Sequence, residues 1–294
     1  MQRKSLFRHA AVVVGAGALV LSTGVVAGAS TFGAKYNAAD AKLVPAPYKT
    51  AVLQVATDAT YPPDESMQGT TMIGFDVDLM NAIASTLGVK IKENNVTFDS
   101  ILAGIKGGRY QIGNSSFTDN TAREKQVYFV DYFQAGEGVY AKKGEKVNFT
   151  GLKSFCGLKI AVETGTVEQT DAQTAAKSCP ASKKAVVLTF PTQTGANLAV
   201  LSGQANVGFA DSQIATFIVA TNKGKFENVG SAINVAPYGI AFPKTATGHK
   251  MALATQAAIK TLIASGVYHA ILAHWGVTQG GLPASKVVIN GAAG

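Results

Sequence analysis

Residues 105–113 read IKGGRYQIG, and residues 200–208 read VLSGQANVG. In both stretches a helix-like segment ends at a glycine and a strand-like segment follows. A polar residue stands three positions after each strand, Ser116 in the first copy and Asp211 in the second. Two copies of this unit indicate two similar lobes, each directing a polar side chain from the carboxyl end of a strand, where open α/β sheets bind ligands. This helix–glycine–strand unit is common in α/β proteins, so it does not decide the fold by itself.

The sequence around these copies alternates strand-like and helix-like segments of ordinary length. In residues 75–87, apolar side chains recur at helical spacing and Gly88 provides a stop. Such alternation indicates an α/β fold with mainly parallel sheets. The expected strands are 52–57, 89–96, 110–113, 157–162, 186–190, 207–210 and 235–242, and the expected helices are 75–87, 100–106, 167–177, 196–201, 212–221, 251–265 and 267–274.

Residues 1–29 have the features of a secretory signal peptide. Three basic residues precede an apolar run at 10–26, and Ala27-Gly28-Ala29 matches a cleavage site. The alternative is a membrane anchor, but a run of 17 residues is shorter than the roughly 20 that a span requires. We expect a mature protein that begins near Ser30 and is soluble in the periplasm or outside the cell. Residues 30–47, rich in alanine and small polar residues, are expected to form a flexible leader, and 285–294 a tail.

Charge and cysteine usage exclude several classes of site. The formal charge of +8 falls to +5 without the three cations of the signal peptide, and the remaining lysines are scattered, so a nucleic-acid partner is not expected. Four histidines and two cysteines form no ligand cluster, so we expect no metal and no cofactor. In an exported chain, Cys156 and Cys179 fit a disulfide better than two separate thiols. The bridge would close a loop worth about 3 kcal/mol in the chain-entropy model.

Several residues could bind the charged groups of a free amino acid. Arg123 follows two hydroxyl residues and could hold a carboxylate through two parallel hydrogen bonds, or form a surface salt bridge. The Thr164–Val167 segment lies between a strand and a helix, where backbone N–H groups favour an anion. Asp211 could pair with an ammonium group or serve as a helix N-cap. Asp58 likewise ends a strand, as a ligand contact or as a turn residue.

Taken together, these segments resemble the polar amino-acid solute-binding proteins of ABC importers (solute-binding family 3, type II periplasmic-binding-protein fold). The resemblance covers about residues 52–281 and rests on the order and spacing of its motifs. The stretch GFDVDL at residues 74–79 is expected to open a helix with a capping acid. The other matching motifs are ATDATYPP at 56–63, FDSIL at 98–102, Ser116-x-Thr118 with Arg123, Gly165-Thr166, ADS at 210–212 and Trp275-Gly276.

The resemblance implies a monomeric protein of two lobes, each built on a mainly parallel sheet flanked by helices. Lobe 1 would comprise residues 48–137 and 238–284, and lobe 2 residues 138–237. Two crossings of the chain, near 137–141 and 237–241, would form the hinge. Closure would trap a free L-amino acid, which a membrane permease of the ABC transporter would then receive.

The resemblance also implies how the two charged ends of the ligand are bound. Arg123 would pair with the carboxylate, helped by the hydroxyl of Thr118 and the backbone N–H of Val167. Asp211 would pair with the ammonium group, supported by Ser116. Thr166 belongs to the same matching motif as Val167 and completes this part of the expected site.

For the ligand side chain, the resemblance implies an aromatic sandwich and a polar end. Tyr61 and Phe98 would enclose the aliphatic part, although either could be ordinary core packing. Asp58 would face the polar end, with Glu168 nearby. Asp64 replaces the aromatic residue usual in the family and would add negative charge near the pocket if it points inward.

These surplus acceptors favour a ligand side chain that donates hydrogen bonds, as a basic one does, over that of Asp or Glu. The alternative is an exported enzyme resembling cyclohexadienyl dehydratase, with Asp58 or Glu168 as its acid or base. No histidine lies near the predicted cleft, and the expected contacts account for the amino acid without catalysis. We therefore expect a binding protein and not an enzyme.

Overall fold

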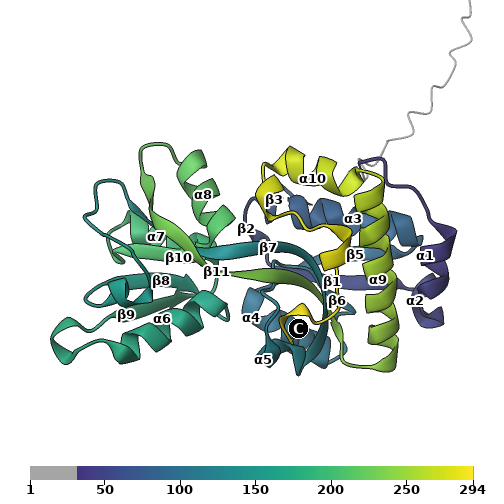
Figure 1. The fold of residues 1–294 in the computed structure, drawn as a ribbon, viewed down its shortest axis with the longest axis horizontal. Coiled ribbons are helices and arrows are strands. Elements are labelled where there is room, and N and C mark those ends of the chain that lie inside the picture. The colour runs from purple at the N-terminus through teal and green to yellow at the C-terminus, as the bar shows by residue number, and fades with distance from the viewer. Residues whose placement is uncertain (1–31, 294) are drawn as a thin grey trace, which may run out of the picture.

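The computed structural model describes residues 32–293 and places them in two lobes side by side (Figure 1). The predicted signal peptide, residues 1–29, lies outside the described residues. None of the helices in the described part of the chain has both the length and the hydropathy that a membrane span requires.

One eight-stranded sheet runs through both lobes. The three strands at each end of this sheet pair in parallel, whereas the contacts around the two long central strands are antiparallel. These long strands, β11 and β7, pass from one lobe to the other (Figure 1). In sheet order the strands are β5 (Lys90–Asn95), β1 (Val52–Thr57), β6 (Ile112–Gly113), β11 (Phe226–Pro243), β7 (Val127–Lys142), β10 (Val207–Asp211), β8 (Lys159–Glu163) and β9 (Val186–Phe190).

Helices cover the sheet in both lobes, as the alternation predicts, and a small second sheet lies in the first lobe. The mixed α/β architecture is therefore confirmed. The small sheet contains β2 (Thr60–Tyr61), β3 (Glu65–Gln68) and β4 (Thr71–Ile73). The first lobe carries α1 (Ala38–Leu43), α2 (Ala46–Thr50), α3 (Phe75–Leu87), α4 (Phe98–Lys106), α5 (Thr121–Glu124), α9 (Ala246–Ala264) and α10 (Val267–Trp275); the second carries α6 (Val167–Ser178), α7 (Gln193–Leu201) and α8 (Ser212–Thr221).

The repeated helix–glycine–strand unit occupies equivalent places in the two lobes. Its strand is β6 beside β1 in the first lobe and β10 beside β8 in the second, parallel in both cases. The side chain of Gln111 accepts a hydrogen bond from the backbone N–H of Gln54 at 2.9 Å. Asn206 accepts one from the N–H of Lys159 at the same distance. The prediction of two similar lobes is therefore confirmed down to matching side-chain contacts.

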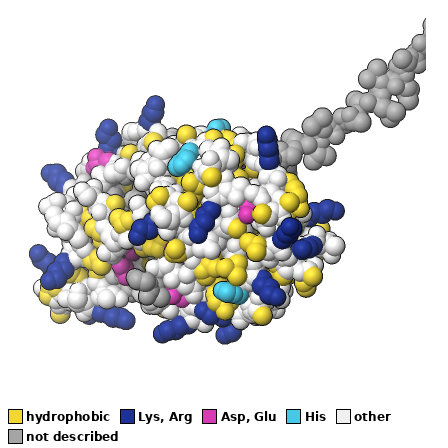
Figure 2. All heavy atoms as spheres, turned by 45° about the vertical axis from the view of Figure 1, so that its right-hand side comes forward, with side chains coloured by type: hydrophobic (Ala, Val, Ile, Leu, Met, Phe, Trp, Pro, Cys, Tyr) yellow, Lys and Arg dark blue, Asp and Glu magenta, His cyan; other side chains and the backbone are white. Residues whose placement is uncertain are grey.

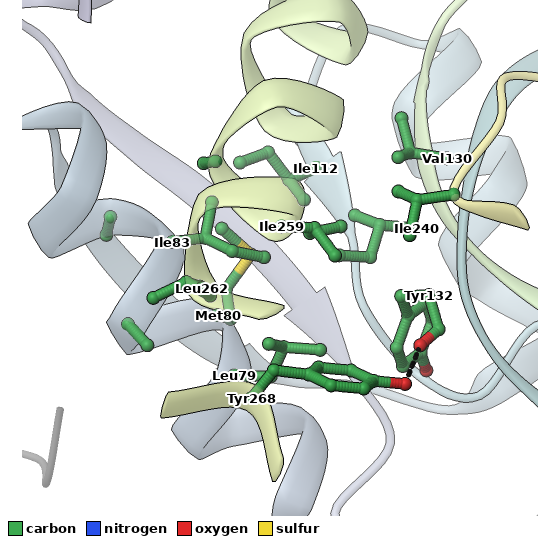
Figure 3. Packing of buried hydrophobic residues seen from close by; sticks show 14 of the residues in the cluster. Leu79, Met80, Ile83, Ile112, Val130, Tyr132, Ile240, Ile259, Leu262 and Tyr268 are labelled. Atoms are coloured by element: carbon green, nitrogen blue, oxygen red, sulfur yellow. Dashed lines mark hydrogen bonds between the residues drawn. The ribbon is translucent and has the colours of Figure 1, made fainter. Parts of the chain in front are cut away.

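The first lobe has an apolar core between α3 and α9 (Figure 3). The apolar stripe of α3 includes Leu79 and Ile83, which are fully buried with Ile259 and Leu262 of α9. Gly88 ends α3 in the left-handed conformation (φ 67°), which glycine adopts without steric cost. Truncating one of these buried side chains to alanine costs about 2–5 kcal/mol in comparable cores. This packing makes the first lobe a firm support for the loops at its strand ends.

The expectation of a flexible leader is wrong from Ala38 onward, because α1 and α2 are helical and α1 packs on the first lobe. The side chain of Asn37 caps α1, and its backbone N–H donates to the carbonyl of Thr86. The carboxylate of Asp40 accepts a hydrogen bond from the hydroxyl of Thr261 in α9 at 2.7 Å. These contacts are tertiary, so composition alone gave no sign of them.

The expectation that an acidic side chain in residues 74–79 caps the helix is also wrong. Gly74 is the N-cap of α3, and no side chain caps the helix there. The buried carboxylate of Asp76 instead accepts the N–H of Ser116 at 2.9 Å and the hydroxyl of Tyr132 at 2.7 Å. Asp76 therefore fixes the loop that follows β6, from which the polar residues of the site project.

The predicted disulfide between Cys156 and Cys179 is present. It joins the turn before β8 to the end of α6, so both partners lie in the second lobe.

Candidate ligand-binding site

A cavity lies between the lobes, at the strand ends that the repeated unit points to. All ten residues expected at the site line it, and the structure adds Glu65, Ser115 and Glu163. The ten are Asp58, Tyr61, Phe98, Ser116, Thr118, Arg123, Thr166, Val167, Glu168 and Asp211.

Arg123 is held in the cavity wall by both lobes. One guanidinium nitrogen, Nη1, donates to the carbonyl of Thr118 at 2.8 Å, and Nη2 donates to the carbonyl of Gly165 at 3.0 Å. The guanidinium also lies over the rings of Phe98 and Phe117, 5.5 and 5.4 Å from their centroids. It is 9% exposed, so the alternative of a surface salt bridge does not apply. The fixed orientation suits bidentate binding of a carboxylate in the cavity.

Asp58 is a turn residue that also lines the cavity. Its Oδ1 accepts the N–H of Thr60 at 3.1 Å, and its Oδ2 accepts the N–H of Phe98, at the start of α4, at 2.8 Å. It thus ties β1 to α4 while facing the cavity. Burial raises the pKa of Asp58, and these hydrogen bonds partly oppose that rise.

Asp211 is the N-cap residue of α8 by position, but its side chain does not bond the N–H groups of that helix. The Asp211 carboxylate accepts a hydrogen bond from the hydroxyl of Tyr61 at 2.8 Å. The oxygen of the same hydroxyl accepts a hydrogen bond from the backbone N–H of Asp211 at 3.1 Å. Burial raises the pKa of Asp211 to about 6, and the bond from Tyr61 lowers it. The expected support from Ser116 is wrong: its hydroxyl donates to Asp64 at 2.8 Å. Tyr61 takes that role and joins the lobes.

Asp64 points inward but lies behind the cavity wall. It is fully buried and also accepts a hydrogen bond from Nε2 of Gln213 at 2.8 Å. Gln213 belongs to the second lobe and donates from the same nitrogen to the hydroxyl of Tyr238 at 2.6 Å. The residue that departs from the family pattern therefore makes a further contact between lobes.

The cavity carboxyls form two pairs, and one pair differs from expectation. Glu168 lies beside Asp211 instead of Asp58. The carboxyl beside Asp58 is Glu163, which sequence reasoning missed. Burial raises the pKa of Glu163 and of Glu168 well above the usual value, and the partner aspartate adds to each rise. The signal for Glu163 was available, since β8 runs into an acid just as β1 does.

The charge of the molecule is divided between a basic surface and an acidic interior. Lysine and arginine side chains are dispersed over the face shown in Figure 2, where few acids are visible. Thirteen of the eighteen acidic residues, all within residues 32–293, are buried, whereas Arg123 is the one buried cation of that range. No group of His, Cys, Asp or Glu in the described range could hold a metal ion. Buried carboxyls must then be protonated, accept hydrogen bonds or pair with a cation.

Comparison with known proteins agrees with this geometry. The sequence profile of the bacterial extracellular solute-binding proteins, family 3, matches residues 53–278. The chain belongs to this family.

Its relatives and structural neighbours share most of its length. The arginine-binding protein ArgT of Corynebacterium glutamicum is 31% identical over 233 residues, covering 78% of this chain and 75% of the relative. An ancestral arginine-binding protein, solved with arginine bound, superposes with a TM-score of 0.70 at 29% identity, covering 76% of this chain and 97% of the neighbour. The ancestral amino-acid-binding protein AncCDT-1, a precursor of cyclohexadienyl dehydratase, superposes with a TM-score of 0.69 at 26% identity. The match covers 77% of this chain and 96% of the neighbour.

Proposed function

We propose that this protein captures a free L-amino acid with a basic side chain between its two lobes and delivers it to the membrane permease of an ABC importer. The observation that carries the proposal is the lining of the cavity, where one arginine accompanies five carboxyl groups. The positive charge of Arg123 balances the carboxylate of the ligand, and the negative charge of Asp211 balances its ammonium group. The remaining acids favour a second positive charge, and the arginine-binding relatives support the same class of ligand.

In this proposal the ligand carboxylate binds the guanidinium of Arg123 and the N–H of Val167 at the start of α6, where the helix dipole favours an anion. The ammonium group binds Asp211, with Glu168 beside it. The site residues so proposed are the ten predicted from the sequence: Asp58, Tyr61, Phe98, Ser116, Thr118, Arg123, Thr166, Val167, Glu168 and Asp211.

We place the lobe boundaries as the sequence predicts, with residues 48–137 and 238–284 in lobe 1 and 138–237 in lobe 2. The hinge then lies in β7 near 137–141 and in β11 near 237–241. The pairing of these strands shifts register between Tyr238 and Gly239, as it also does earlier in β11, which supports bending there. A ligand that contacts both lobes favours the closed state by its differential affinity. Small-angle scattering should show compaction on saturation, and an unchanged radius of gyration would contradict closure.

The proposed protein is exported, monomeric and not an enzyme. The neighbour related to cyclohexadienyl dehydratase is itself described as an amino-acid-binding protein, which supports capture without turnover. Conversion of a prephenate-like substrate by the purified protein would favour the enzyme instead.

Thermal-shift screening with the twenty L-amino acids, followed by calorimetric titration, tests the proposal directly. Because ligands that bind the folded state raise its stability, Arg, Lys or His should give the largest shifts. D-arginine is the control for specific contacts to the carboxylate and ammonium groups. Stabilisation mainly by glutamate, or by no amino acid at all, would overturn the proposal.

A further inference from the structure

The turn at residues 61–64 of the first lobe meets the start of α8 in the second lobe at two points. At the first, the hydroxyl of Tyr61 donates to the carboxylate of Asp211 at 2.8 Å. At the second, Nε2 of Gln213 donates to Oδ2 of Asp64, also at 2.8 Å. Both residues of the first contact line the cavity, but those of the second do not. The second contact therefore joins the lobes from a place outside the wall of the ligand site.

The acceptor on Asp64 is held in a fixed place within the first lobe. The side chain is fully buried, and Oδ2 also accepts a hydrogen bond from the hydroxyl of Ser116 at 2.8 Å. The backbone carbonyl of Asp64 accepts a hydrogen bond from the N–H of Asp76 at 3.0 Å. Gly74 lies so close to this carbonyl that a Cβ at Gly74 would stand 2.0 Å from its oxygen. The first lobe therefore presents Oδ2 to α8 with little freedom to move.

Gln213 reaches two acceptors of the first lobe from a single nitrogen. It is the second residue of α8 and is 7% exposed. Besides Asp64, Nε2 donates to the hydroxyl of Tyr238 at 2.6 Å. Tyr238 belongs to the apolar core of the first lobe and stands at a register shift in β11. Because α8 and the turn before β3 belong to different lobes, rotation of one lobe away from the other breaks the bond between Gln213 and Asp64.

Two buried oxygens oppose this contact. Oδ1 of Asp64 and Oε1 of Gln213 have no hydrogen-bond partner among the described residues. A buried acceptor without a donor is destabilising, and water reaches such an acceptor when the lobes separate. The net stabilisation from the contact is therefore smaller than that from a fully satisfied pair. A contact of this kind favours the apposed lobes without locking them together.

We propose that Asp64 and Gln213 form a latch that stabilises the apposed lobes and thereby sets the affinity of the site without touching the ligand. The inference rests on the proposed function and adds two positioning residues outside the cavity. A ligand that binds only the apposed lobes has an apparent Kd that rises as the fraction of molecules in that state falls. Weakening the latch lowers this fraction whichever ligand is present, so it should raise every Kd by the same factor. The cavity residues then decide which amino acid binds, and the latch contributes to how tightly it is held.

Gln213→Leu removes the amide and keeps a side chain of similar size. In calorimetric titrations it should raise the Kd for arginine and the Kd for lysine by about tenfold each, because losing one buried hydrogen bond corresponds to roughly that factor. The ratio of the two Kd values should not change. At saturating arginine, small-angle scattering should give the same radius of gyration as for the wild type, and near-UV circular dichroism verifies that the variant is folded.

Variants of Asp64 test the same contact from the other lobe. Asp64→Ala removes the acceptor and should also raise both Kd values by about tenfold. The double variant Asp64→Ala/Gln213→Leu should match Gln213→Leu alone, because the second change removes a contact that the first has already broken. Asp64→Asn keeps an acceptor oxygen of the same reach, so its Kd values should stay within about threefold of the wild type.

Gln193→Leu is the matched control. Gln193 is a glutamine of α7 that is 1% exposed, and its Nε2 donates to the hydroxyl of Tyr140 at 2.8 Å within the second lobe. Its replacement should leave both Kd values unchanged. The inference fails if Gln213→Leu has no larger effect than this control, if it changes the two Kd values by different factors, or if its effect adds to that of Asp64→Ala. If the wild type binds no amino acid, the proposed function itself is wrong.

Discussion

Replacing Arg123 by lysine keeps the positive charge and removes the planar fork. The guanidinium reaches two backbone carbonyls from opposite lobes and presents its other N–H groups to the cavity. A lysine ammonium has its donors on a single atom, so it cannot bond both carbonyls and a carboxylate in the same geometry. The loss of one charged hydrogen bond costs about 1.5–3 kcal/mol. Weaker contact with the rings of Phe98 and Phe117 adds about 0.5–1 kcal/mol.

Arg123→Lys should therefore raise the Kd for arginine by about 30- to 1,000-fold, since each 1.4 kcal/mol is a factor of ten. Calorimetric titration measures the change, and near-UV circular dichroism verifies that the variant is folded. Arg109→Lys is the control, because Arg109 is an exposed arginine of the same lobe. A Kd for Arg123→Lys within about threefold of the wild type would refute the reasoning and place the ligand carboxylate elsewhere.

Three further predictions concern the lobe contact, the disulfide and a buried acid outside the cavity. Tyr61→Phe removes the hydroxyl that bonds Asp211, so the pKa of Asp211 should rise above about 6 in an NMR titration, and affinity near neutral pH should fall by about fivefold. The double variant Cys156→Ser/Cys179→Ser should lose about 3 kcal/mol of unfolding free energy in urea denaturation yet still bind ligand, because the bridge lies wholly in the second lobe; an unchanged midpoint would contradict this. Burial raises the pKa of Asp131 to about 8, so its contribution to stability is present at low pH and lost as the pH rises through that value. Asp131→Asn should make the decline in stability between about pH 4 and 8 shallower, and a decline equal to that of the wild type would argue against this assignment.

Elements with a strong local pattern were predictable to the residue. The strand 52–57, the helix 75–87, the strand 186–190 and the helix 212–221 have the predicted bounds, because periodicity and local stop signals are encoded within each segment. The predicted strand 235–242 is only the end of β11, and β7 was not predicted. Fourteen of the sixteen residues of β7 are buried or half-buried, so it shows no alternation between an apolar and a polar face.

The candidate site was predicted more completely than the contacts within it. The resemblance implied ten residues that all line the cavity, since family motifs mark positions in the chain. Partners were harder to foresee: Ser116 bonds Asp64, and Glu168 lies beside Asp211. A side chain finds its partner by distance in space, which sequence separation does not give.

The repeated unit at residues 105–113 and 200–208 indicated two things from the sequence: two similar lobes, and a polar residue after the strand in each. Only the tertiary structure decided that the lobes present those strand ends to each other. Asp58 follows β1 and Glu163 ends β8; the two residues are 105 positions apart, and these strands do not pair. They line the same cavity because β7 and β11 carry the chain from one half of the sheet to the other. Burial there shifts their proton equilibrium, and burial is a property of the assembled fold.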